Sequence, residues 1–535
     1  MSQTTRPTVG LPRTALGPHA LARWAGEAPD RIAVRHADGE QLSYAALDRR
    51  ARQWATGLEE HGIEPGTHVA TFLPNGFDAQ TLWLGLGWLR AIEVPLNTGL
   101  RGALLRHALV ASDARILVTT RPLLERVMEI EQELPSLERI LLVDGEQTDV
   151  TASWPVFGLQ SSVREAPPAD RPGPEYRDIA AILFTSGTTG PAKPVLIPWA
   201  MVYQNWSWAP EDAIAEGEFA YCAMPMFHNS GRSALNGCLV RGGSFLFREQ
   251  FSGTHFWDDI RKNDCRLASL VGPMTALINA APPRDDDADN PLRAILCGPL
   301  IREIERFEER FGLRVATGYG QTEIGMAVVT DWNHGPWANC GRARVDYPWS
   351  EVRVVDENDE PLGPGEVGEL VVRSAEPWAL NSGYYKLPEA TAEAYRNGWF
   401  HTGDAFRYDE DGWYYLVDRM KDAIRRRGEN ISSFEVESIV AEHPDVLECA
   451  AVAAPAELGE DEVRIVLIGR DPGSFEPAAL IAWLEPRMPR YMLPRYIDVV
   501  EDLPRNETTG RIKKHALRAA GIGPETWDRE RSGSS

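Results

Sequence analysis

Hydrophobic residues in the first third of the chain follow two alternating patterns. Short apolar runs of strand composition occupy 69–73 and 92–96, and apolar residues at helical spacing occupy 42–58. Further runs of the two kinds predict strands at 114–119 and 139–143 and helices at 81–89 and from about 102. Alternating strands and helices are typical of parallel sheets covered by helices, so the pattern predicts an α/β fold.

The pattern changes near residue 419, where charge density rises and the elements become shorter. Apolar spacing then predicts helices over 434–440 and 477–486 and strands over 449–452 and 463–468. This mixture is typical of a small α+β unit. The sequence therefore predicts two domains, residues 1–418 and residues 419–535.

One polar stretch lies between two buried-strand patterns, which end at Phe184 and begin again at Val195. It contains glycines, hydroxyl side chains and a lysine: Thr185, Ser186, Gly187, Thr188, Thr189, Gly190 and Lys193. Glycines let backbone N–H groups surround an oxyanion, hydroxyls add donors, and lysine supplies a positive charge. An ordinary Ser/Thr/Gly turn is the alternative, but the length of the pattern favours a phosphate-binding loop. The loop leads into a strand and lacks the Walker A spacing.

Composition narrows the class of partner. The formal net charge is −23, which argues against nucleic acid or an anionic membrane as a partner. No apolar run approaches the roughly 18 residues of a membrane span, and the N-terminus lacks a signal-peptide core. The six cysteines show no Cys-x-x-Cys spacing, which predicts a cytoplasmic protein without a zinc site or disulfides. Cys297 is expected to be a buried strand residue rather than a nucleophile.

A second polar motif lies at 315–325. Gly320 lets the chain pass close to a ligand, and Tyr319 offers a flat face to a base. Thr322 can donate to a phosphate, and Glu323 is a hard oxygen ligand suited to Mg²⁺. The alternative is a plain glycine-rich turn at a strand end.

These two motifs resemble those of the adenylate-forming superfamily, the AMP-dependent acyl-CoA synthetases and ligases. The resemblance covers nearly the whole chain, and the run at 488–496 is most similar to the crotonobetaine/carnitine–CoA ligase-like branch. It implies a large N-terminal domain of several subdomains and a small mobile C-terminal domain that swings about a hinge at Lys421. One departure is Pro194, which stands where the family usually has glycine.

The resemblance also implies roles for residues that mean little alone. Gly298 would line the adenine pocket, Asp404 would accept from the ribose hydroxyls, and Arg419 would contact ribose or phosphate. Gly428 would lie beside the pantetheine arm of coenzyme A. His228 has two interpretations, a structural histidine beside an aromatic residue or a gate between acyl pocket and ATP, and we favour the gate.

The last family motif departs from the usual pattern at 508–514. Arg511 stands where the family has the lysine that bridges carboxylate and α-phosphate, and the loop is one residue longer. Three hypotheses stay open and are ranked in this order. Arg511 replaces the lysine, Lys513 or Lys514 takes its place, or the first half-reaction is lost or altered.

The resulting functional hypothesis is an ATP- and Mg²⁺-dependent ligase that adenylates a small organic acid and transfers it to an acceptor, most simply coenzyme A. Two alternatives remain: a diazotase of secondary metabolism that activates nitrite for an aromatic amine, and a degenerate, non-catalytic nucleotide-binding relative. No carrier domain is expected in cis. The sequence predicts neither the acid nor the oligomeric state.

Overall fold

The computed structural model describes most of the chain between residues 11 and 532. The described residues are 11–145, 152–159, 163, 166–185, 192–345, 350–419, 424–426, 429–431, 433–455, 461–471, 473, 475–488, 490–505 and 512–532. For 418, 419, 425, 426, 429, 430, 435, 455, 491 and 532 the backbone alone is described.

The described chain divides into two compact units. The large unit contains residues 11–185, 192–352 and 372–400, and the small unit contains 353–371 and the residues from 401 onward. The predicted phosphate loop at 186–191, the predicted hinge at Lys421, Gly428 and the segment 506–511 with Arg511 lie outside the described residues.

The first sheet of the large unit has the strand order β14-β13-β12-β10-β11-β1-β2. Its neighbouring strands are parallel except for the antiparallel pair β1–β2. The strands are β1 (Ile32–His36), β2 (Gln41–Ser43), β10 (Phe219–Cys222), β11 (Ser244–Phe247), β12 (Cys265–Val271), β13 (Ala294–Gly298) and β14 (Arg314–Ala316). Such a sheet brings the carboxyl ends of β10, β12, β13 and β14 to one edge, where open α/β sheets bind ligands.

The second sheet has the order β7-β6-β5-β3-β4-β8-β9, parallel except for the antiparallel pair β8–β9. Its strands are β3 (His68–Phe72), β4 (Ile92–Pro95), β5 (Ile116–Thr119), β6 (Arg139–Leu142), β7 (Val156–Gly158), β8 (Ile179–Phe184) and β9 (Pro194–Pro198). The alternation in the sequence therefore folds as parallel α/β layers, as predicted.

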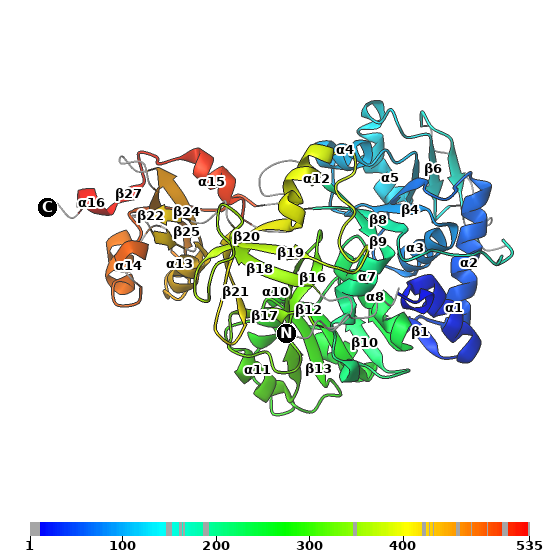
Figure 1. The fold of residues 1–535 in the computed structure, drawn as a ribbon, viewed down its shortest axis with the longest axis horizontal. Coiled ribbons are helices and arrows are strands. Elements are labelled where there is room, and N and C mark those ends of the chain that lie inside the picture. Colours follow the sequence, from blue (N-terminus) through cyan, green and yellow to red (C-terminus); the bar gives the residue numbers. More distant parts are fainter. Residues whose placement is uncertain are drawn as a thin grey trace. The chain divides into compact units, whose positions relative to one another are not determined.

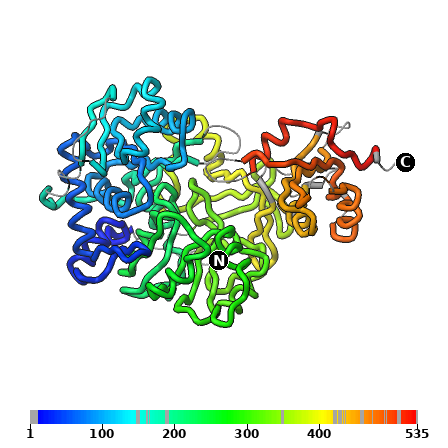
Figure 2. Tube along the Cα trace, turned by 180° about the vertical axis from the view of Figure 1, so that it is seen from behind, coloured from blue at the N-terminus to red at the C-terminus, as the bar shows by residue number. Residues whose placement is uncertain are grey.

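Helices cover these sheets, and α1, α2 and α3 lie side by side (Figures 1 and 2). The α-helices of the large unit are α1 (Gly17–Glu27), α2 (Tyr44–Glu60), α3 (Phe77–Leu89), α4 (Gly102–Ala111), α5 (Arg121–Met128), α7 (Trp199–Ser207), α8 (Asn229–Arg241), α9 (Phe256–Lys262), α10 (Gly272–Asn279), α11 (Ile304–Phe311) and α12 (Pro388–Ala394). Short 3₁₀ turns occupy Arg13–Ala15, Glu131–Glu133, Glu211–Ala213 and Arg396–Gly398. Helix α3 is buried along its length from Ala79, and Trp83 stacks on Trp199 of α7 at 5.1 Å between ring centroids.

The start of α2 shows how a polar cap shifts a predicted boundary. The apolar pattern predicted a helix from residue 42, but Leu42 belongs to β2 and pairs with Val34 of β1. The Ser43 hydroxyl accepts a hydrogen bond from the backbone N–H of Ala46 at 3.3 Å. This cap satisfies a donor in the first turn, so the helix begins at Tyr44.

Three further strands of the large unit form antiparallel pairs after β14. They are β15 (Gly318–Gln321), β16 (Gly325–Val329) and β17 (Asn339–Ala343). The turn between β15 and β16 carries the second sequence motif. The chain therefore passes from the carboxyl end of β14 directly into this hairpin.

In the small unit, strands follow the order β21-β20-β19-β18, and a second sheet follows β24-β25-β26-β27. The strands are β18 (Glu351–Val355), β19 (Gly368–Arg373), β20 (Phe400–Tyr408), β21 (Tyr414–Arg419), β22 (Ile424–Arg426), β23 (Glu429–Ile431), β24 (Val446–Pro455), β25 (Asp461–Gly469), β26 (Tyr496–Val499) and β27 (Trp527–Asp528). Helices are α13 (Ser433–Val440), α14 (Pro477–Leu484), α15 (Lys514–Ala520), α16 (Arg529–Ser532) and a 3₁₀ turn at Arg490–Met492. Apolar residues of the small unit form a hydrophobic core of their own.

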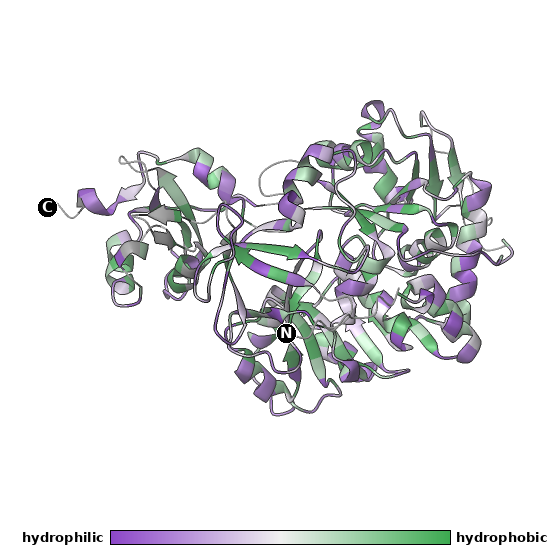
Figure 3. Cartoon of the chain, in the orientation of Figure 1, coloured by the Kyte–Doolittle hydropathy of each residue, from purple (hydrophilic) through white to green (hydrophobic). Residues whose placement is uncertain are grey.

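Hydrophobic residues concentrate on the central strands and on the helix faces that cover them (Figure 3). Within the part of the chain that is described, no helix combines the length and the hydrophobicity that crossing a bilayer requires. Cys297 is 2 % exposed in β13, as predicted, and burial raises the pKa of its thiol to about 11.

Candidate active site

The predicted phosphate loop begins and ends at a closed strand pair. Phe184, the last residue of β8, is opposite Pro194, the first residue of β9. Beyond this pair, the Thr185 N–H donates to the Lys193 carbonyl at 3.2 Å, and the Lys193 N–H donates to the Thr185 hydroxyl at 3.4 Å. Both ends of the loop are therefore fixed by the sheet, and Lys193 has its place at the loop exit.

Pro194 fits this position because proline is tolerated at the first residue of a strand. Its carbonyl remains available and accepts the N–H of Tyr385 at 2.8 Å. The departure from glycine is thus compatible with the strand pairing.

The segment 382–385 runs along the other side of β9. Leu196 donates to the Gly383 carbonyl at 3.0 Å, Ser382 donates to the Leu196 carbonyl at 2.9 Å, and Val195 forms an antiparallel bridge with Tyr384. The backbone pairing brings Tyr384 next to the strand that begins just after Lys193.

Tyr384 connects the two sequence motifs. The Lys193 ammonium lies 4.8 Å from the centre of the Tyr384 ring, within the range of a cation–π contact. The Tyr384 hydroxyl donates to Oε1 of Glu323 at 3.2 Å. Burial, with a further contribution from the charge of Glu323, raises the pKa of Tyr384, so the phenol stays protonated and acts as a donor. Lys193, Tyr384 and Glu323 therefore form a continuous contact chain.

The backbone at Glu323 is held from a neighbouring segment. The Glu323 carbonyl accepts both the backbone N–H and the side-chain amide of Asn381, at 3.2 and 2.7 Å. Gln204 of α7 pairs with Met326 in the same way, accepting its N–H at 3.1 Å and donating to its carbonyl at 2.8 Å. These bonds fix the β15–β16 turn that carries Glu323.

Two glycines in this hairpin are required by space. A Cβ on Gly320 would lie 2.0 Å from the Gly325 carbonyl oxygen. A Cβ on Gly325, whose φ is +62°, would lie 1.9 Å from Oε1 of Gln204. Both glycines are therefore needed for the tight packing of the hairpin, and the approach of Gly320 to a ligand stays a prediction.

The residues predicted for the adenine side come from two segments: Gly298 is the last residue of β13, and Tyr319 and Gly320 lie in β15. A Cβ on Gly298 would lie 2.9 Å from the Gly318 carbonyl oxygen, so the two segments are in contact. Tyr319 follows Gly318 and is 8 % exposed, whereas Gly320 is exposed. Thr322 is half-buried in the turn that follows.

His228 lies in the connection that follows β10 and is the N-cap residue of α8. Its side chain is exposed and its ring lies 4.8 Å from that of Phe227. The preceding turn is held from the interior, because Arg232 donates to the Met226 carbonyl. Arg232 in turn pairs with Glu93 at 2.8 Å, and both are almost fully buried. The gating role of His228 stays a prediction.

Asp404 and Arg419 belong to the small unit, where they are directly opposite each other in the β20–β21 pair. Asp404 is 3 % exposed. The turn before it is shaped by Glu369, which accepts the N–H of Gly403 at 2.8 Å and bonds Nδ1 of His401 at 2.9 Å. The two residues predicted at the ribose are thus neighbours in the sheet.

Lys514 begins α15, is half-buried, and contacts α13 of the small unit. Its ammonium lies 2.8 Å from Oε1 of Glu437 and also donates to the Ser433 hydroxyl. Arg505 and Ile512 form an antiparallel bridge, so the segment with Arg511 starts and ends at adjacent backbone positions.

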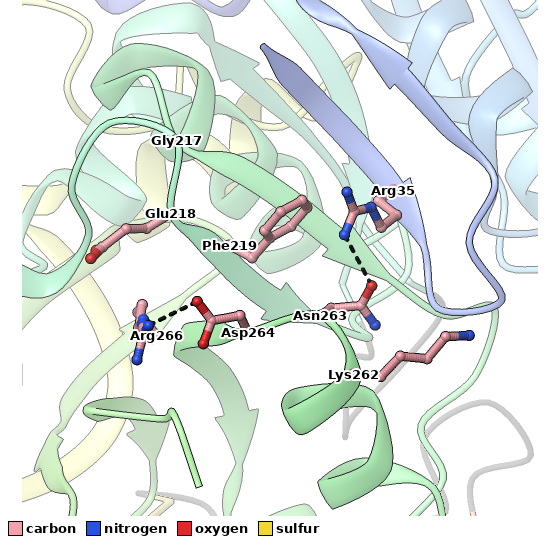
Figure 4. Close-up of a pocket in the computed structure, with 8 residues that line it drawn as sticks. All are labelled: Arg35, Gly217, Glu218, Phe219, Lys262, Asn263, Asp264 and Arg266. Carbon is pink, nitrogen blue, oxygen red and sulfur yellow. Dashed lines mark hydrogen bonds and ion pairs between the residues drawn. The ribbon is translucent and has the colours of Figure 1, made fainter.

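A pocket of about 350 Å³ lies elsewhere, where β10 and β12 begin (Figure 4). Arg35 there covers the Phe219 ring at 4.2 Å and donates to Asn263, while Arg266 pairs with Asp264 at 2.8 Å. The amino ends of parallel strands are opposite to the edge where open α/β sheets bind ligands. This pocket is therefore not the candidate site. No cluster of three or more His, Cys, Asp or Glu residues suited to a metal occurs in the described ranges.

Sequence reasoning missed Tyr384, Asn381 and Gln204. Tyr384 and Asn381 lie in the run Asn-Ser-Gly-Tyr-Tyr at 381–385, whose glycine and paired tyrosines are the one local signal. Gln204 lies in an apolar helix, and a fully buried glutamine there is a signal of a required polar contact.

Comparison with known proteins places this geometry in a family. The model of the AMP-binding enzyme family matches residues 21–385, and that of the AMP-binding enzyme C-terminal domain matches residues 435–509. The crotonobetaine/carnitine–CoA ligase of Salmonella paratyphi B is 30% identical over 490 residues, which cover 89% of this chain and 93% of that protein.

Solved structures agree with the fold. ATP-bound MatB from Rhodopseudomonas palustris is 25% identical with a TM-score of 0.79, covering 94% of this chain and 99% of that one. The o-succinylbenzoate–CoA synthetase of Bacillus subtilis, solved with its acyl-adenylate intermediate, is 24% identical with a TM-score of 0.80, covering 93% and 97%. The predicted family and fold class are confirmed. The chain belongs to the AMP-binding enzyme family and is an AMP-forming ligase of the adenylate-forming, acyl-CoA synthetase type.

Proposed function

We propose that this ligase adenylates a small organic acid with MgATP and transfers the acyl group to coenzyme A. The observation that carries the proposal is the contact chain Lys193–Tyr384–Glu323 at the exit of the predicted phosphate loop. A cation and a carboxylate held at this spacing by one phenol suit a nucleotide triphosphate and its metal. The crotonobetaine/carnitine–CoA ligase relatives support coenzyme A as the acceptor.

Glu323 fits a magnesium site that is completed by substrate. The Tyr384 hydroxyl donates to Oε1 of Glu323, and a carboxylate has about four lone-pair sites, so a carboxylate can accept a hydrogen bond and bind a cation at the same time. Mg²⁺ is usually bound by one or two carboxylates together with waters and substrate phosphates. Glu323 would hold the ion, which when bound would neutralise phosphate charge. Lys193, Thr322 and the loop from Thr185 would hold the pyrophosphate side.

The remaining residues would bind the nucleoside. Gly298, Tyr319 and Gly320 would border adenine, because Gly298 is in contact with Gly318, the first residue of the strand that carries the other two. Asp404 would accept from the ribose hydroxyls, and Arg419 would contact ribose or phosphate. A nearly buried carboxylate such as Asp404 is a good acceptor for two vicinal hydroxyls.

The chemistry divides into two half-reactions. A carboxylate oxygen attacks the α-phosphorus of ATP. The bond from this phosphorus to the oxygen that bridges it to the β-phosphate breaks, and pyrophosphate leaves with that bond's electron pair. The thiolate of coenzyme A then attacks the acyl carbonyl, and AMP leaves. Positioning and charge neutralisation supply most of the catalysis in such reactions. We propose that Arg511 neutralises the negative charge that develops at the α-phosphate. Residues 419–535 would be the mobile domain, and Gly428 would lie beside the pantetheine arm of coenzyme A.

ATP–pyrophosphate exchange tests the proposal, with a panel of small carboxylic acids in one arm and nitrite plus aryl amines in the other. We expect exchange with a carboxylic acid and an acyl-CoA product by mass spectrometry. Glu323→Gln should lose exchange, whereas Glu357→Gln, the same change at an exposed position, should retain it. Exchange with nitrite alone would favour a diazotase, and no exchange with any acid would sink the adenylation proposal.

A further inference from the structure

We propose that helix α4 is a positioning element for Lys193, acting through His107 on one chain segment and through Asp113 on another. This inference rests on the proposed function, because it concerns the same triphosphate grip. Helix α4 contacts the end of β8, because its His107 packs against Phe184. His107 is in its last two turns, and Asp113 follows its C-cap at Ser112.

His107 touches both ends of the loop neck. Its Nε2 lies 2.8 Å from the carbonyl oxygen of Ala192, the residue before Lys193. A carbonyl can only accept, so Nε2 carries the proton and donates. The imidazole also meets the Phe184 ring edge-on at 6.0 Å, and Phe184 is the last residue of β8. One half-buried side chain therefore bridges the strand that enters the loop and the residue that leaves it.

Asp113 holds the segment that carries Tyr384. Its Oδ2 accepts the Tyr385 hydroxyl at 2.9 Å and pairs with the Lys386 ammonium. The hydrogen bond from Lys386 is the largest cause that lowers the pKa of Asp113, so this carboxylate is ionised at neutral pH. The Tyr385 ring packs against His68 at 4.8 Å between centroids, and His68 bonds the Ser112 carbonyl at 2.7 Å.

His107 and Asp113 both hold chain segments that border the Lys193 ammonium. In the described part of the chain the Lys193 side chain is exposed and its ammonium meets the Tyr384 ring. The direction of a long flexible side chain then depends on its own backbone and on that ring. His107 fixes the backbone at Ala192, and Asp113 fixes the residue after Tyr384. Helix α4 and the Asp113 that follows it thus hold the chain next to both partners of the cation–π contact.

A positioning role predicts a selective effect on the triphosphate. His107→Leu removes the donor and should weaken binding of the non-hydrolysable analogue α,β-methylene-ATP about three- to tenfold, the usual worth of one hydrogen bond. AMP lacks the β- and γ-phosphates, so its affinity should stay within twofold. His107→Gln keeps an N–H donor on a side chain of similar reach and should recover most of the loss. Tyr385→Phe should show a smaller loss of the same selective kind.

Calorimetric titration of the full chain with MgATP analogue and with AMP separates the outcomes. His61→Leu is the matched control. His61 is also half-buried and packs on an aromatic ring, but that ring is Phe157 of the edge strand β7, at the opposite end of the sheet from β8 and β9. If the wild type binds neither nucleotide, the proposed function fails. If the wild type binds both and His107→Leu weakens AMP as much as the analogue, or weakens neither, the positioning role of α4 is overturned. A thermal melt matched to His61→Leu confirms that the variant is folded.

Discussion

Tyr384 is the test of the contact chain, because its two functions can be removed separately. Tyr384→Phe keeps the ring above which the Lys193 ammonium lies and deletes the hydroxyl that donates to Glu323. Tyr384→Leu deletes both. If the chain holds the metal-binding carboxylate and the phosphate-binding lysine, the two variants must differ in a defined order.

The structure sets the size of each effect. A hydrogen bond to a charged acceptor contributes about 1.5–3 kcal/mol, and the 3.2 Å distance to Glu323 favours the lower end. About 1.4 kcal/mol is a factor of ten, so Tyr384→Phe should lower kcat/KM for MgATP about tenfold. The cation–π contact of an exposed lysine contributes about 0.5–1 kcal/mol, a further factor of about two to five. Tyr384→Leu should therefore lower kcat/KM about 20- to 50-fold.

Initial rates of ATP–pyrophosphate exchange, measured over a range of MgATP, give these ratios. The control is Tyr44→Phe, which also deletes a buried hydroxyl, bonded at 2.6 Å to the Gly243 carbonyl, in a part of the core outside the site. It should cost stability and leave KM for ATP unchanged. If Tyr384→Phe stays within twofold of wild type, or equals Tyr384→Leu, the contact chain does not position the triphosphate.

Three further predictions concern stability and are read from unfolding curves. Glu93→Gln leaves the buried Arg232 without its carboxylate and should lower the free energy of unfolding in urea by about 3–5 kcal/mol. The double variant Glu93→Leu, Arg232→Met should lose less than this single variant. A loss below about 1 kcal/mol for Glu93→Gln would contradict the prediction. A hydrogen bond to Glu308, opposed by burial, raises the pKa of His334, so its stabilisation is complete below about pH 6.5 and is lost as pH rises through the raised pKa. The melting temperature of wild type should therefore fall more between pH 6 and 8 than that of His334→Gln, and parallel curves would refute the linkage. Lys514→Ala breaks a half-buried ion pair and should cost about 1–2 kcal/mol of stability in the small unit by calorimetry, and an unchanged melt would contradict the pair.

The fold was largely predictable because its signals are local. The apolar run 69–73 has the length and composition of a buried strand and largely coincides with β3, and the periodicity over 42–58 indicates one buried helix face, as α2 has. The boundaries were less predictable. Leu42 fits the apolar spacing of the helix but pairs with Val34 in a hairpin, whose one local signal is Asp38-Gly39 between the two strands. The order of strands in the two sheets depends on such pairings and could not be read from the pattern.

The candidate site shows the same division. Lys193 and Glu323 were predictable, because each lies in a motif whose residue types match one chemistry. Tyr384 was not, because its role exists only after the segment 382–385 pairs with β9. The contact with Glu323 spans 61 positions in the sequence. A tyrosine in a short polar run has no property that distinguishes it until that pairing is known.

The contacts of Lys514 narrow the question of what replaces the missing family lysine. The sequence allowed Arg511, Lys513 or Lys514, since all three are cations within one short segment. The Lys514 ammonium bonds both Glu437 and Ser433 of α13, and moving it toward a ligand would break both of these contacts. The Glu437 carboxylate also accepts the Ala451 N–H at 2.7 Å, so it cannot follow the lysine. A catalytic Lys514 would therefore have to break a packed structural contact in every turnover. Lys514 is therefore the less suitable cation, and we expect Arg511→Ala, rather than Lys514→Ala, to abolish adenylation in the ATP–pyrophosphate exchange assay.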